Sequence, residues 1–144
     1  MKVIVFYNSK FGNGKTMSEY MVKSFVKKNH KAKAFSMQEV QPKKLEQADL
    51  YIFSSSTHIG NAPFKTRGFL KKIRKQNKAN FALVTTNLAP QKSKTIKTMR
   101  EILAKRGYVE AKDPLILKVD SMKGPLEKDY QEKVDLFIDD VGLG

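Results

Sequence analysis

The sequence predicts an α/β domain in three layers, with a doubly wound, parallel, five-stranded sheet between helices. Short apolar runs rich in β-branched or aromatic residues alternate along the chain with longer segments of helical period. The chain has no internal repeat and no linker-like change of composition, and 144 residues suffice for one buried core. We therefore expect residues 1–144 to form a single domain with helices on both faces of the sheet.

The first part of the chain contains two expected strands around one expected helix. Residues 2–7 are expected to form a strand, and the last five of them are a continuous apolar run, which is typical of a buried parallel strand. Residues 31–35 form a weaker strand of alternating character. The helix between them covers residues 14–28, and its apolar face consists of Met17, Met21 and Phe25.

The middle of the chain repeats this alternation. Residues 49–54 and 81–86 each contain a run of four apolar residues, which predicts two further buried strands. The helix expected between them covers residues 63–78, and the residues that face inward are Phe69, Leu70 and Ile73.

The last part of the chain contains two helices and one interrupted strand. The first helix covers residues 94–106 and ends at Gly107, a typical residue just after a helix. The strand covers residues 108–119 and is interrupted at Asp113-Pro114. Pro125 is expected at the first position of the final helix. The inward-facing residues of the two helices are Ile96, Met99 and Leu103, then Tyr130, Val134, Ile138 and Val141.

Composition excludes several kinds of site and indicates a positive field. The chain has no Cys, which removes disulfides, thiolate nucleophiles and sulfur-ligated metal clusters. Its apolar runs are too short for a membrane span or a signal peptide, so we expect a cytoplasmic protein. The net charge is +14, mostly from Lys. This excess is either a solvated surface or a means of attracting an acidic partner.

The segment between the first strand and the first helix is the expected ligand site. Residues 8–15 lead into a helix start, where backbone N–H groups lack intrahelical partners and the helix dipole is positive. Such a turn binds phosphate. In a doubly wound sheet it lies at the carboxyl edge, beside the loops at residues 55–63 and 87–93.

Two phosphate ligands compete for this first loop. Gly14-Lys15-Thr16 matches the end of a nucleoside-triphosphate P-loop, but Ser9 stands where that motif has its first Gly. No acidic residue directly follows the expected strands at 49–54 and 81–86, where a P-loop enzyme organises its Mg²⁺. We favour the other ligand, a mononucleotide whose single phosphate is held by residues 9–14.

The first and second loops resemble those of the flavodoxin-like family. Ser9-Lys10-Phe11-Gly12-Asn13-Gly14 stands in the register of that family's first loop, Ser/Thr-x-Thr-Gly-Asn-Thr. The segment Ser56-Thr57-His58-Ile59-Gly60-Asn61-Ala62-Pro63 is similar to the loop that lines the flavin. The resemblance covers nearly the whole chain. It implies the strand order 2-1-3-4-5, FMN as the cofactor, and electron transfer between redox partners as the function.

The resemblance also implies which residues bind the cofactor. Phe11 and Gly14 replace two hydroxyl residues that usually bind phosphate in the family, which leaves Ser9 and Thr16 as hydroxyl donors. No residue is assigned to catalysis or to a metal. The expected cofactor-binding residues are Ser9, Lys10, Phe11, Gly12, Asn13, Gly14, Ser56, Thr57, His58, Ile59, Gly60, Asn61, Thr86, Asn87 and Leu88.

Two positions of the second loop have specific expected roles. By resemblance, the peptide between Gly60 and Asn61 flips so that its carbonyl accepts a hydrogen bond from the reduced flavin, which Gly permits at low cost. The alternative is a simple turn before the next helix. The imidazole of His58, with an ordinary pKa of about 6.5, suits proton delivery to the flavin, but a loop His is also commonly a surface or packing residue.

Two other functions stay open beside electron transfer. The third loop, residues 87–92, is similar to that of quinone-linked protoporphyrinogen oxidases of the same superfamily, although their long insertion is missing. The altered first and third loops are also compatible with a flavin-free binding module for an acidic partner. We expect an electron carrier rather than an enzyme that turns over a substrate.

The positive charge predicts a docking surface and a redox property. Arg67, Lys71, Arg74 and Lys78 form a basic stripe on the expected helix, which either covers the core as a solvated face or docks an acidic redox protein. Peripheral contact with a membrane is compatible with the charge, whereas no nucleic-acid-binding module is recognisable. Because positive surroundings favour the anionic reduced flavin, we expect a less negative second reduction step than in acidic flavodoxins.

Overall fold

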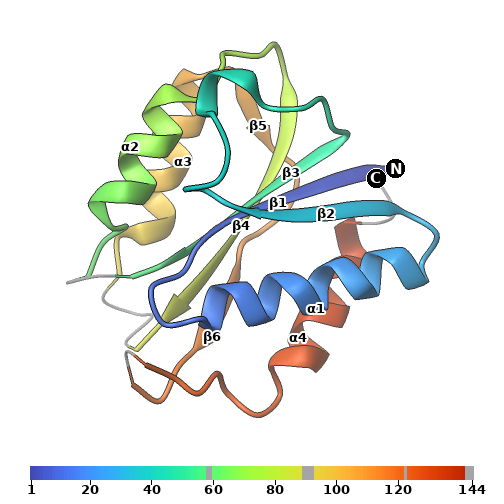
Figure 1. The fold of residues 1–144 in the computed structure, drawn as a ribbon, viewed down its shortest axis with the longest axis vertical. Helices are drawn as coiled ribbons and strands as arrows, with labels where there is room; N and C mark the ends of the chain where they lie inside the picture. Colours follow the sequence, from blue (N-terminus) through green and yellow to red (C-terminus); the bar gives the residue numbers. More distant parts are fainter. Residues whose placement is uncertain (58–59, 89–92, 122, 142–144) are drawn as a thin grey trace.

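A parallel sheet lies between two pairs of helices (Figure 1). The computed structural model describes residues 1–57, 60–88, 93–121 and 123–141. The strands are β1 Lys2–Asn8, β2 Lys31–Ser36, β3 Leu50–Ser56, β4 Ala79–Asn87, β5 Tyr108–Glu110 and β6 Leu115–Lys118. They pair in the order β2-β1-β3-β4-β5, and β6 also pairs with β4. The predicted doubly wound sheet with order 2-1-3-4-5 is confirmed.

Helices connect the strands and cover both faces of the sheet (Figure 1). They are α1 Asn13–Lys27, the 3-10 helix η1 Pro42–Lys44, α2 Phe64–Lys72, α3 Thr95–Lys105 and α4 Tyr130–Val141. None of the helices in the described ranges combines the length and the apolar character needed to cross a bilayer.

The alternation of side chains along the strands divides the core into two halves. On β1, Ile4 and Phe6 pack toward α2 and α3, whereas Val3 and Val5 pack toward α1 and α4. The predicted inward residues of the first three helices are buried except Ile96, which is partly buried. Since both faces of the central strands are covered, these strands read as continuous apolar runs in the sequence.

The fifth strand is divided in two, as Asp113-Pro114 predicts. The segment β5 pairs with the first three residues of β4, and β6 pairs with the last four. Pro114 has no N–H to give to the ladder, so the pairing stops and restarts around it.

The helix predicted over residues 63–78 is shorter than expected, and that prediction was wrong at its carboxyl end. The helix ends at Lys72, and Ile73 is already extended, with φ −61° and ψ 150°. The backbone N–H of Arg74 donates to the carbonyl of Pro42 at 3.0 Å, and the Tyr108 hydroxyl donates to the carbonyl of Arg74 at 3.0 Å. These tertiary hydrogen bonds replace the helical ones that the residue spacing alone indicates.

The start of the last helix also differs from the prediction. Pro125 is not its first residue: the Gly124-Pro125 peptide is cis, and α4 begins at Tyr130. The Pro125 carbonyl accepts a hydrogen bond from the Asp120 N–H at 3.1 Å, and Leu126 forms an antiparallel bridge with Val119. Pro125 therefore belongs to a turn that folds back on the end of β6.

The predicted helix end at Gly107 is confirmed. Its φ is 86°, in the left-handed region, and its N–H donates to the Ala104 carbonyl at 3.2 Å. A Cβ at this position would lie 1.6 Å from the carbonyl oxygen of Gln76. Glycine is required here both by conformation and by the close approach of another backbone segment.

Candidate functional site

A cavity of about 430 Å³ opens at the carboxyl edge of the sheet. Strands β1, β3 and β4 end there in register, with Asn8 opposite Ser55 and Ser56 opposite Thr86. The lining comes from the ends of five strands, β1, β2, β3, β4 and β6, with the segments that follow them, and from the start of α2. It consists of Asn8, Ser9, Lys10, Phe11, Asn13, Gly14, Gln38, Ser56, Thr57, Pro63, Phe64, Lys65, Thr86, Leu88 and Val119.

Most of the predicted binding residues line this cavity. They are Ser9, Lys10, Phe11, Asn13, Gly14, Ser56, Thr57, Thr86 and Leu88. Gly12, Gly60, Asn61 and Asn87 belong to the same loops but are not part of the lining. His58 and Ile59 lie outside the described residues, as does the third-loop segment 89–92.

Ser9 organises the end of the cavity that lies at the start of α1. The helix α1 begins at Asn13, and its first intrahelical hydrogen bond runs from the Thr16 N–H to the Gly12 carbonyl at 2.9 Å. The N–H groups before that bond have no helical acceptor. Ser9 Oγ accepts from two N–H groups of this turn, those of Gly12 at 3.0 Å and Gly14 at 3.1 Å. The serine oxygen thus accepts from two N–H groups of this turn, which leaves its own O–H to donate to an anion bound beside it.

The electrostatic environment of this turn is positive. The first turn of α1 contains no acidic residue, and Lys15 lies within it. Lys10 Nζ lies 5.3 Å from the centroid of the Phe11 ring, at the same mouth. No Asp or Glu is among the residues that line the cavity in the described chain. The helix dipole and both lysines therefore favour an anion.

The floor of the cavity at Asn8 is tied into a buried hydrogen-bond network. Asn8 Nδ2 donates to Thr66 Oγ1 at 2.9 Å, and Ser55 Oγ lies 2.8 Å from the same oxygen. Thr66 is fully buried. The network ties the ends of β1 and β3 to α2, which fixes the floor of the cavity in place.

Tyr7 precedes this floor on β1 and stays in its neutral form. Burial raises the pKa of its phenol above the ordinary value, and the carboxylates of Glu39 and Glu19 raise it further. The carboxyl end of β1 therefore adds no negative charge beside the anion-binding turn.

The second loop is attached to α3. Thr57 N–H donates to the Thr86 carbonyl at 3.1 Å, and its Oγ1 lies 2.8 Å from Thr95 Oγ1. The carbonyl of Gly60 accepts a hydrogen bond from the Lys94 N–H at 2.7 Å, and the φ angle of Gly60 is 75°. A peptide flip after Gly60 would have to break this hydrogen bond.

Asn61 has a structural role that the sequence did not indicate. Its Oδ1 accepts from its neighbour, the Ala62 N–H at 2.8 Å, and from Thr98 Oγ1 at 2.7 Å. The side chain therefore joins the second loop to α3 rather than pointing into the cavity.

The rim of the cavity is apolar. Phe11, Phe64 and Leu88 are exposed by 40%, 80% and 46%, although all three are large apolar residues. They come from three separate segments and meet around one opening. Exposed apolar groups gathered at a cavity mouth are typical of a binding site.

Several lining residues were missed by sequence reasoning: Asn8, Gln38, Pro63, Phe64, Lys65 and Val119. Phe64 carried a usable signal, because it lies off the inward face of its helix, which Phe69 and Leu70 define. Gln38 and Val119 reach the cavity from segments with no motif.

A second, smaller cavity of about 280 Å³ adjoins the first. The two share Asn8, Gln38, Phe64 and Lys65. Its lining includes Gly68, a mid-helix glycine where an added Cβ would meet nothing within 4 Å.

Comparison with known proteins identifies the fold. The family model described as a flavodoxin domain matches residues 4–116. Oxidised flavodoxin 1 from Bacillus cereus aligns with a TM-score of 0.82 and 17% identity, covering 99% of this chain and 98% of that chain. The flavodoxin of Streptococcus pneumonia TIGR4 has a TM-score of 0.80 at 12% identity, covering 99% of each chain. Fusobacterium nucleatum flavodoxin bound to flavin mononucleotide has a TM-score of 0.73 at 13% identity, covering 99% and 97%. No curated protein matches the sequence.

Proposed function

The chain belongs to the flavodoxin domain family, and on that basis we propose that it binds FMN in the larger cavity and carries electrons between redox partners. The observation that carries the proposal is the division of this cavity into an anion-binding end and an apolar rim. The volume of about 430 Å³ is within the range of small-ligand sites.

The turn at the start of α1 fits the phosphate group. Its N–H groups and helix dipole attract an anion, and the hydroxyl of Ser9 is already held against two of those N–H groups. Gly14 keeps the turn tight, because a Cβ there would lie 3.3 Å from Ser9 Cβ. Among the described residues the lining holds no carboxylate, which favours a monoester phosphate over a magnesium-bound triphosphate.

The rim fits the planar flavin ring. Phe64, Phe11 and Leu88 present exposed apolar surface that a bound ring system would cover. When bound, FMN supplies the electron-transfer chemistry, and the chain supplies binding, orientation and electrostatics. The Asn8–Thr66–Ser55 network holds the cavity floor, and the attachment of Thr57 to α3 fixes the adjoining wall.

An acidic redox protein is the proposed partner, in keeping with the charge of +14. Of the basic stripe expected for docking, Arg67 and Lys71 lie on α2, whereas Arg74 and Lys78 follow its end. Arg67 Nε donates to the Ala62 carbonyl at 3.1 Å, which keeps that guanidinium beside the second loop. Arg67 therefore remains the residue proposed for docking. No described feature favours a quinone-linked enzyme or a flavin-free module over this proposal.

Titration of the purified, flavin-free protein with FMN tests the proposal. We expect quenching of flavin fluorescence at a 1:1 ratio. The Ser9→Ala variant should bind FMN roughly tenfold or more weakly, because it loses a hydrogen bond to a charged group. Ser121→Ala serves as the control, since the Ser121 hydroxyl donates to the Gly124 carbonyl, outside the lining. Binding of a nucleoside triphosphate with Mg²⁺ in place of FMN would overturn the assignment.

A further inference from the structure

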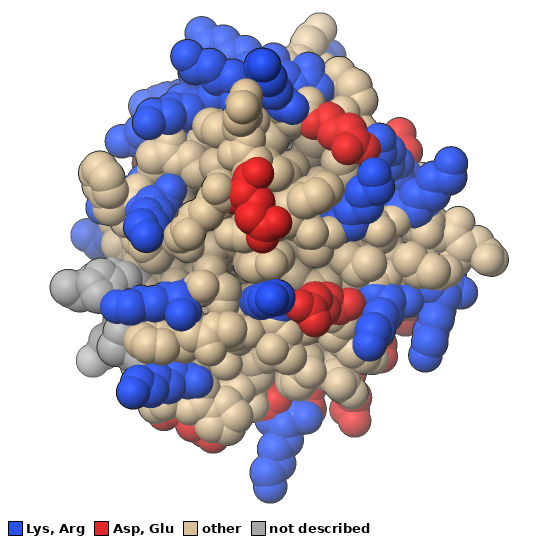
Figure 2. Space-filling model, viewed as in Figure 1, with Lys and Arg blue, Asp and Glu red and all other residues tan. Residues whose placement is uncertain are grey.

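Lysines gather at the amino edge of the sheet, opposite the larger cavity. We call this surface the basic pole, and it consists of Lys43, Lys44, Lys71, Lys72, Lys75, Lys78 and Lys105. All of these lysines are exposed. They come from η1, from the carboxyl ends of α2 and α3, and from the segment between α2 and β4. Figure 2 shows basic side chains massed at the top of the view, where Figure 1 places η1 and the end of α2.

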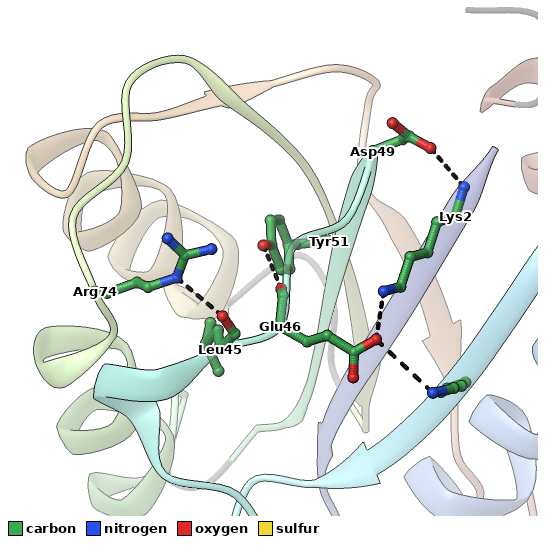
Figure 3. Close-up of polar contacts among 7 residues, drawn as sticks. Lys2, Leu45, Glu46, Asp49, Tyr51 and Arg74 are labelled. Atoms are coloured by element: carbon green, nitrogen blue, oxygen red, sulfur yellow. Dashed lines mark hydrogen bonds and ion pairs between the residues drawn. The ribbon is translucent and has the colours of Figure 1, made fainter.

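Hydrogen bonds to backbone carbonyls hold the segments of the basic pole together. Arg74 Nε donates to the Leu45 carbonyl at 3.0 Å, which ties the end of α2 to the segment after η1 (Figure 3). The Gln76 N–H donates to the Arg106 carbonyl at 3.0 Å, and the Lys78 N–H donates to the Gly107 carbonyl at 2.9 Å. The lysines are therefore displayed on a fixed surface rather than on a loose tail.

The charge of the basic pole is uncompensated. None of its lysines forms an ion pair with any residue that the structure describes, whereas Lys2, Lys28 and Lys133 elsewhere all do. Placing cations at the carboxyl ends of α2 and α3 accounts for Lys71, Lys72 and Lys105, which complement the helix dipoles. It does not account for the other lysines, because η1 is a single short turn and the segment after α2 is not helical.

We propose that the basic pole binds the anionic headgroups of a lipid bilayer. The cations are ammonium groups, which act as point charges on a charged surface without bidentate base recognition. None of the large exposed apolar residues of the described chain lies in residues 42–45, 71–78 or 105–107, so the surface offers no aromatic platform for nucleotide bases. Only Lys72 borders either cavity described above, so the pole is not a groove for a nucleic-acid strand.

This attachment would leave the larger cavity facing away from the bilayer. The pole lies at the amino edge of the sheet and the cavity at the carboxyl edge, so both surfaces are usable at the same time. The proposal does not depend on which ligand the cavity takes.

Sedimentation with vesicles tests the proposal. The full chain is mixed with vesicles of equal parts phosphatidylglycerol and phosphatidylcholine, or of phosphatidylcholine alone, at low and high salt. We expect binding only to the anionic vesicles and a loss of binding at high salt. Replacing Lys43, Lys44, Lys75 and Lys78 by Gln should weaken binding at least tenfold, because each lysine near an anionic surface contributes about fivefold.

The matched control removes the same charge elsewhere. Lys23, Lys27, Lys97 and Lys128 are exposed, outside the pole and without an ion pair in the described chain, and their replacement by Gln should weaken binding less than about threefold. If the pole variant does not fold, the two pairs Lys43/Lys44 and Lys75/Lys78 are replaced separately. Equal weakening by both sets, no binding of the unmodified chain to anionic vesicles, or tighter binding to a 20-base-pair DNA duplex through the same lysines would overturn the proposal.

Discussion

Phe64 shows how one residue can mark a site that a motif does not. It opens α2 with 80% of its side chain exposed, more than any other large apolar residue in the described ranges. It borders both cavities. The folded protein gains little hydrophobic stabilisation from this exposed ring. A bound planar group that covers the ring would bury it and so gain that free energy on binding.

Truncation of this side chain should affect binding and leave folding alone. The Phe64→Ala variant should bind FMN roughly two- to tenfold more weakly, which corresponds to a lost aromatic contact of about 0.5–1.5 kcal/mol. Its free energy of unfolding should change by less than about 0.5 kcal/mol, because the ring is not packed. Fluorescence titration and urea denaturation measure the two quantities.

Leu136→Ala is the control, since Leu136 is 66% exposed on α4 and lines neither cavity. It should leave FMN affinity unchanged. Unaltered affinity in Phe64→Ala as well would mean that the ring does not cover the flavin.

The sequence located the loops that line the larger cavity better than the side chains that reach it. Ser9 and Gly14, in the turn before and at the start of α1, were expected to line it, because a turn between a buried strand and a helix has few possible geometries. Gln38 and Lys65 were missed, because their contact with the cavity depends on how distant segments pack. The direction of the Asn61 side chain likewise depends on α3, which no local pattern encodes.

At the scale of single elements, α2 combines a poor helix former with an early end. Gly68 lies in its middle, and an added Cβ there would meet nothing within 4 Å. The glycine is therefore not required by packing, and its cost to the helix is not repaid by a contact in the described chain.

Filling this position should stabilise the protein. Gly68→Ala is expected to raise the free energy of unfolding by about 0.5–1 kcal/mol, because alanine loses less backbone entropy in a helix. Urea denaturation measures the change.

Gly107→Ala provides the opposite case and serves as the comparison. Its φ of 86° and the approach of Gln76 to 1.6 Å from a Cβ predict a loss of about 2 kcal/mol or more. A destabilised Gly68→Ala variant would show that α2 is strained in a way that its contacts do not reveal.

Element types were predictable, whereas element ends depended on tertiary contacts. The glycine that follows α3 and the break at Pro114 act locally, so both were predicted. Arg74 and Pro125 lie at positions where the local residue pattern predicts a helix. Arg74 instead donates to Pro42, which is distant in the sequence, and Pro125 accepts from Asp120 across a turn. These hydrogen bonds are incompatible with a helix at either position.

At the scale of the whole molecule, a small ion cluster links separate strands at the amino edge of the sheet (Figure 3). Glu46 pairs with Lys2 of β1, and Lys33 Nζ of β2 lies 3.8 Å from the same carboxylate. The backbone N–H of Lys2 also donates to Asp49 Oδ2 at 2.6 Å. The connection before β3 is thereby attached to both β1 and β2.

This cluster predicts a specific pH dependence of stability. The hydrogen bond from Lys2 lowers the pKa of Glu46 below its ordinary value, although burial opposes the shift. Its contribution is therefore present above the unfolded-state pKa of about 4.3 and is lost as pH falls through the lower folded-state pKa. Glu46→Gln should cost at most about 1 kcal/mol near pH 7, since the pair is largely exposed to solvent.

Denaturation of both proteins across the acid range measures this difference, which should shrink below about pH 4. Glu101→Gln, whose carboxylate has no ion pair in the described ranges, should show no comparable effect. A difference that persists unchanged in acid would assign the effect of Glu46 to packing instead of charge.

The overall charge predicts a redox property of the FMN complex. With a net charge of +14, the second reduction step should occur at a less negative potential than in acidic flavodoxins, because the field stabilises added negative charge. Potentiometric titration at low and at high salt measures it, and the difference should narrow as salt screens the field. An equally low potential at low salt would show that contacts at the ring outweigh the surface charge.

The interrupted fifth strand has a consequence for how copies of this protein meet. One border of the sheet is β2, whose exposed Lys31 and Lys33 would repel a second copy aligned against it. The other border is formed by β5 and β6, two short pieces separated at Pro114. Neither edge strand is both long and free of charged side chains, so neither offers a good template for pairing with a strand of another molecule. At high concentration, the charged edge at β2 and the broken edge at β5 and β6 therefore disfavour strand pairing between molecules and the growth of fibrils.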